Sequence, residues 1–144
     1  MPRILRAVND ESRLRVQLGD VREGLLAVHK ALLAVARTEY EREHGPVASP
    51  GALLQLLVHD AAFVWLHPVS ELAARADELL EEADLPVAEV SALARTAAEI
   101  LTPDEAGAGF AKRYFDALQA SPDVVLAHAG ARRAVKALGA QFEA

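Results

Sequence analysis

Five side chains of this sequence could bind a metal ion. Three are histidines that fall on the apolar stripes of three different predicted helices, and two are aspartates. Helical bundles build metal sites from side chains on facing helices, and imidazole combined with carboxylate suits Zn, Fe or Mn. A histidine on an apolar face can instead be a structural imidazole bonded to a carbonyl or carboxylate, and we favour this interpretation. The candidate ligands are His29, His59, Asp60, Asp123 and His128.

Four of these residues follow a known order. His29, then the adjacent pair His59-Asp60, then the distant Asp123 resemble the ligand pattern of the HD-domain metal-dependent phosphohydrolases. That resemblance implies an all-helical fold in which these four residues hold a divalent metal and a metal-bound water attacks a phosphate. A metal or haem sensor that uses one or two of the histidines is the related alternative.

A second resemblance covers more of the chain. A leucine run leads into His59-Asp60, aromatic residues and a proline, and the blocks GFAKRYFDAL and SPDVVLAH follow later. In this order they resemble a family of small uncharacterised bacterial proteins, over about residues 24–133. The resemblance implies an all-helical fold and no particular function.

The central stretch 49–83 should carry the candidate pair His59-Asp60 on a helix. Ser49-Pro50 is a helix start, because Ser caps the first turn and Pro fits its first position. The apolar spacing after Pro68 is again helical, and a proline interrupts the hydrogen bonds of a helix. The pattern therefore predicts either one helix kinked at Pro68 or two helices that meet near His67. Residues 52–66 are apolar almost all round, which predicts burial on most sides.

A long first helix is expected from about Asp10 to Glu43, with Asn9 or Asp10 as its cap. Gly45-Pro46 is a stop signal after it. A short hairpin within residues 3–18 is the rival interpretation, and a flexible arm over residues 1–9 is a further alternative. The apolar positions that favour the helix recur at steps of four and three: Leu14, Leu18, Val21, Leu25, Val28, Leu32 and Val35.

Three further helical segments are expected after residue 85. The first covers about 86–101. The tetrapeptide 102–105, Thr-Pro-Asp-Glu, matches a capping box and predicts that the next helix starts there. Ser121-Pro122 repeats the start signal for a last helix that reaches about Leu138. The chain is thus predicted to be all-α, a single domain over 1–144, with five to six helices in a bundle and a proline-kinked central helix.

Composition excludes several classes of function. The 144 residues are 52% hydrophobic and include no cysteine, so disulfides and thiolate metal sites are ruled out. The net charge is −6, and residues 49–105 carry 11 acidic and 2 basic side chains, which argues against nucleic-acid binding. The apolar run is too short to span a bilayer, and no signal peptide is recognisable at the start. We therefore expect a cytoplasmic protein with no membrane partner.

The favoured function is binding of a protein partner, most simply a second copy in a homodimer, with no catalysis. The long first helix is the expected pairing surface, because its apolar seam is unbroken. The alternatives are a metal-dependent phosphohydrolase or sensor, with a divalent metal as the cofactor, and a small-molecule sensor with a pocket near Pro68. No residue is assigned a catalytic role.

Overall fold

The computed structural model describes residues 3–143, with side chains from Asp10 onward. This part of the chain is all-α, as predicted, and contains no strand. Within residues 3–143 no helix combines the length and hydrophobicity that a membrane crossing requires. The helices are α1 (Arg3–His44), α2 (Pro50–His59), α3 (Ala61–Val64), α4 (His67–Glu81), α5 (Val87–Ile100), α6 (Phe110–Ala120) and α7 (Pro122–Ala140).

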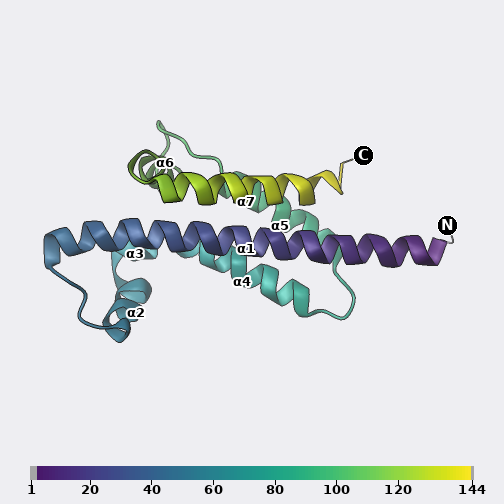
Figure 1. Cartoon of the computed structure of the whole chain (residues 1–144), viewed down its shortest axis with the longest axis horizontal. Coiled ribbons are helices and arrows are strands. Elements are labelled where there is room, and N and C mark those ends of the chain that lie inside the picture. Colours follow the sequence, from purple (N-terminus) through teal and green to yellow (C-terminus); the bar gives the residue numbers. More distant parts are fainter. Residues whose placement is uncertain (1–2, 144) are drawn as a thin grey trace.

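Helix α1 runs the length of the molecule, and α4 and α7 pack along it (Figure 1). Helix α5 contacts both α4 and α7, so four helices surround the main core. The seam predicted for the first helix forms the α1 side of that core, because its side chains recur on one face of the helix. Fully buried seam residues are Leu18, Val21, Leu25, Val28 and Leu32.

Helices α1 and α7 approach closely at Gly24. A Cβ atom added to Gly24 would lie 2.8 Å from the Cα of Ala131 and 3.1 Å from its Cβ. A side chain at position 24 would therefore collide with the α7 backbone. The glycine that weakens helix propensity at this position makes the contact between the two helices possible.

The turn between α4 and α5 is tied to α1 by two side chains. The Arg15 guanidinium donates hydrogen bonds to the carbonyls of Leu80, Glu82 and Ala83 at 3.1, 2.7 and 2.9 Å. Glu11 accepts a hydrogen bond from the Leu85 amide at 3.1 Å, and this bond lowers the Glu11 pKa, with Arg15 adding to the effect. A cation at a helix C-terminus satisfies carbonyls that have no partner within the helix.

The N-terminal part of the chain differs from the prediction. Helix α1 already includes Arg3 and continues through Asn9 and Asp10, so neither residue caps the helix. The rival hairpin is wrong, because its described residues are helical. Residues 1 and 2 of the expected flexible arm lie outside the described residues.

The central stretch is three separate helices in place of one proline-kinked helix. The first break is at Asp60, whose φ and ψ of −89° and 133° are extended. The second is at Trp65 and Leu66, between α3 and α4. Pro68 lies in the first turn of α4, where its missing N–H costs nothing, so the proline starts a helix and does not bend one.

The predicted capping box at 102–105 is not used. This segment is a loop, and α6 begins eight residues later at Phe110, after Gly109 with a positive φ of 64°. Thr102 donates back to the Ala98 carbonyl of α5, and Asp104 accepts from the Ala106 amide within the loop. Thr102 is therefore engaged by the end of α5 and does not cap α6. The described part of the chain has seven helices against the five to six predicted.

Candidate functional site

The two half-buried candidate histidines belong to different helices of the fold. His29 is half-buried on α1, where burial lowers its pKa and the neighbouring His67 lowers it further. His128, on α7, pairs through Nδ1 with the Tyr114 hydroxyl of α6 at 2.6 Å. Burial, and then the charge of Arg132, lowers the His128 pKa, so the neutral ring can accept the bond from Tyr114.

The other three candidates lie at helix ends. His59 is the last residue of α2 and is exposed. Asp60 caps α3, with Oδ1 accepting from the Ala62 amide at 2.8 Å. Asp123 is exposed in the first turn of α7. Within residues 3–143 no three His, Cys, Asp or Glu side chains are grouped so that they could hold a metal ion. The metal hypothesis thus stays a prediction from the sequence.

His67 has a structural role that the sequence did not reveal. Its Nε2 atom lies 2.8 Å from the Leu57 carbonyl oxygen, so the ring can donate a hydrogen bond from the start of α4 to α2. Ten positions separate the two residues, and two helix breaks lie between them. Only the folded chain brings them together.

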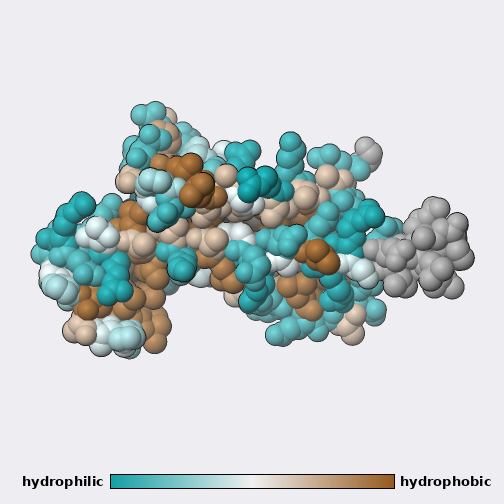
Figure 2. Space-filling model, in the orientation of Figure 1, coloured by the Kyte–Doolittle hydropathy of each residue, from teal (hydrophilic) through white to brown (hydrophobic). Residues whose placement is uncertain are grey.

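Helix α2 is the most unusual element of the fold. Its sequence, PGALLQLLVH, is apolar, yet none of its residues is buried. Leu54 is 57% exposed and Val58 is 51% exposed. Hydrophobic residues gather over this helix at the lower left of Figure 2. The expectation that residues 52–66 are buried on most sides is therefore wrong for α2.

The inner side of α2 contacts the rest of the molecule through partly buried side chains. Leu53, Leu56 and Leu57 pack, partly buried, against the core, and α3 is the main neighbouring helix. Helix α3 is anchored in turn, because Phe63 is fully buried and lies beside Tyr40 of α1. The apolar outer side of α2 is thus held in place through α3, which is anchored in the core.

A groove of about 500 Å³ lies between α2 and the end of α1. Tyr40 and His44 line it from α1, the loop 45–48 closes one end, and Gln55 and Leu56 line it from α2. Loop 45–48 starts with Gly45, whose φ of 80° lets the chain leave α1 as predicted. The groove and the exposed stripe of α2 are neighbours on one surface.

The expected pairing surface on α1 is not free. Its seam is covered by α4 and α7 of the same chain. Periodicity revealed the seam but not which helix would cover it. Among the described residues, α2 is the helix that exposes apolar side chains and has no buried residue.

The chain matches no protein-family model, and comparison with curated proteins and with solved structures finds no match either.

Proposed function

We propose that this protein is a non-catalytic helical-bundle protein that pairs with a second copy of itself through α2. The observation that supports the proposal is an apolar helix in which no residue is buried. Exposed apolar patches on a folded protein mark interaction surfaces, because leaving them in water forfeits the free energy of burial.

The charge of the surface favours a second copy as the occupant. Helix α2 contains no Asp, Glu, Lys or Arg, although the whole chain carries a net charge of −6. Two copies of this surface can meet without placing like charges together. A protein partner selected by charge would require a charged patch on α2, and none is present.

The outward stripe of α2 is suited to a two-fold pair. Gly51, Leu54, Gln55 and Val58 recur at helical spacing on the exposed side. In an antiparallel pair, Leu54 of one copy lies beside the partner's Val58, and the reverse contact follows by symmetry. Gly51 has no side chain to hold the two backbones apart.

The size of the surface sets the expected affinity. A ten-residue helix is about 15 Å long, which is short for a stable interface of about 800 Å² per partner. The groove beside α2 can add contact area. We therefore expect a dimer with a dissociation constant in the micromolar range, about −8 kcal/mol.

Sedimentation equilibrium over a range of concentrations tests the proposal. Wild type is expected to change from monomer to dimer across the micromolar range. The variant Leu54→Glu places a carboxylate in the pair and should be monomeric throughout. Leu126→Glu is the matched control, because Leu126 is 72% exposed on α7, away from α2, and the variant should dimerise like wild type.

A strict monomer at hundreds of micromolar would contradict the proposal. Equal dimerisation of wild type and Leu54→Glu would also contradict it, because the contact would then lie elsewhere. Circular dichroism should show the same helix content in all three proteins, since both substituted leucines are exposed.

A further inference from the structure

A second surface feature, independent of α2, lies between α5 and α7. It is a groove of about 610 Å³, within the usual size range of small-molecule sites. Its apolar wall includes Ala94 and Leu101 of the α5 segment and Val135 and Phe142 of the α7 segment. Leu101 and Val135 belong to the buried core, so the base of the groove is firmly packed.

Cationic side chains line the same groove. They outnumber the acidic ones, because Glu143 is the one carboxylate among the lining residues. Within the described residues none of these cations forms an ion pair, and Arg95 bonds only the Ser91 hydroxyl. The cations are Arg95, Arg132, Arg133 and Lys136.

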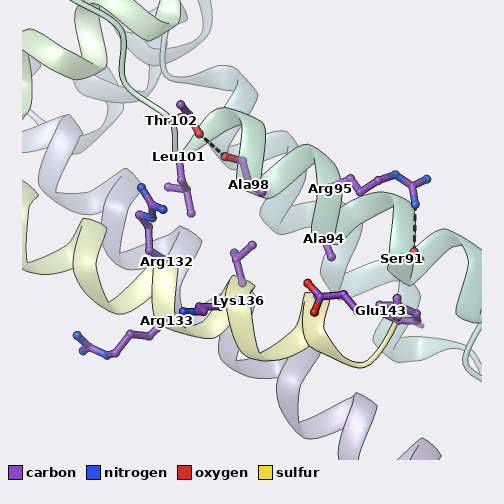
Figure 3. Close-up of a pocket in the computed structure, with 13 residues that line it drawn as sticks. Ser91, Ala94, Arg95, Ala98, Leu101, Thr102, Arg132, Arg133, Lys136 and Glu143 are labelled. Atoms are coloured by element: carbon purple, nitrogen blue, oxygen red, sulfur yellow. Dashed lines mark hydrogen bonds between the residues drawn. The ribbon is translucent and has the colours of Figure 1, made fainter.

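The cations are not equivalent. Figure 3 shows Arg132 reaching from α7 toward Leu101 and Thr102 at the end of α5, whereas Arg133 points away from the groove. The Glu143 carboxylate points toward the middle of the groove. The end of the groove at Arg132 is therefore the end at which an anion would be held.

We infer that this groove binds a small organic anion with an apolar body, of the class of medium-chain carboxylates. The acid group lies at Arg132, with Lys136 one helical turn further along α7, and the apolar body lies along Ala94, Val135 and Phe142. From Leu101 to Ser91 the groove follows about ten residues of α5, or about 15 Å, which suits an extended chain such as decanoate. A nucleic-acid strand fits less well, because the groove is short and the chain as a whole is acidic.

Isothermal titration calorimetry with decanoate tests this inference. Wild type should bind decanoate saturably, and methyl decanoate, which lacks the charge, should bind about tenfold or more weakly. Arg132→Gln should weaken decanoate binding about tenfold, and Lys136→Gln should weaken it by a smaller factor. Glu143→Gln should strengthen binding, because it removes the one negative charge that faces the anion.

Lys112→Gln is the control for a general loss of positive charge. Lys112 lies on α6 outside the groove and pairs with Asp116, so its removal should leave decanoate binding unchanged. Arg132→Gln and Lys136→Gln alter exposed side chains, and their helix content should equal that of wild type. Sedimentation of wild type with saturating decanoate should show the same dimerisation as without it.

Three results of the decanoate titrations would overturn the inference, and a competition result would be a fourth. They are the absence of saturable binding up to millimolar decanoate, equal binding of decanoate and its methyl ester, and equal binding by wild type and Arg132→Gln. A single-stranded oligonucleotide that displaces decanoate would also overturn it, because the groove would then be part of a nucleic-acid surface.

Discussion

Among the single residues, two half-buried imidazoles have pKa values that burial lowers. Burial lowers the pKa of His29 and of His128 below the ordinary 6.5, and the neighbouring His67 and Arg132, respectively, lower it further. The neutral rings suit their surroundings, because His128 accepts a bond from Tyr114, whose own pKa is raised by burial. The structural interpretation that we favour from the sequence stays a prediction for His29, whereas His128 has a hydrogen-bond partner within the fold.

The lowered pKa values make stability depend on pH. Below pH 6.5, His29 and His128 bind more protons in the unfolded chain than in the folded chain, because their pKa values are lowered by folding. The free energy of unfolding should therefore fall as the pH drops through 6.5. Urea unfolding at pH 7.5, 6.5 and 5.5 measures this slope. The double variant His29→Gln/His128→Gln should show a smaller slope than wild type. An unchanged slope would mean that other groups are responsible.

Among the helices, packing depends on how closely two neighbouring helices can approach each other. Gly19 and Gly24 both lie inside α1 and both weaken it as an isolated helix. A Cβ atom at Gly19 would meet nothing within 4 Å, whereas one at Gly24 would meet the Ala131 backbone of α7. The same residue type therefore has opposite consequences at two positions five residues apart.

Substitution by alanine separates these effects. Gly19→Ala should stabilise the protein by about 0.5–1 kcal/mol, because alanine favours the helix. Gly24→Ala should destabilise it by about 1–3 kcal/mol, because α1 and α7 must move apart. Urea unfolding of the two variants and wild type gives both values. Stabilisation by Gly24→Ala would show that α7 shifts at little cost.

At the scale of the whole molecule, local stability should vary along the chain. The α1 seam is buried under α4 and α7, whereas α2 has no buried residue and is held chiefly by α3 and by His67. Opening of α2 therefore exposes little additional apolar surface. In the proposed dimer, the α2 helix of the second copy covers the apolar side of α2 that is exposed in the monomer.

Hydrogen exchange can follow this difference directly. Backbone amides of residues 50–59 should exchange faster than those of residues 18–36 at low protein concentration. Their exchange should slow as the concentration is raised through the micromolar range, because pairing protects them. Leu54→Glu should abolish the concentration dependence. If the amides of α2 are strongly protected at every protein concentration, two claims are contradicted. These are the low local stability of α2 and its protection by dimerisation.

Local sequence patterns were enough to predict the features that depend on neighbours within about four residues. Ser49 and Ser121 cap α2 and α7, Gly45 ends α1, and the seam of α1 is buried as its spacing predicted. Each of these signals is a local hydrogen bond, a backbone preference or a helical period, so no distant residue is needed to recognise it.

Local patterns could not predict which surfaces are covered and which distant side chains meet, because both depend on the folded chain. An apolar pattern shows that a face avoids water, but not which element covers it. The apolar seam of α1 is buried, whereas the apolar residues of α2 are not. The close approach of α1 and α7 at Gly24 and the cationic groove between α5 and α7 depend on contacts between distant segments. Those contacts are set by the packing of the whole chain, which local spacing does not encode.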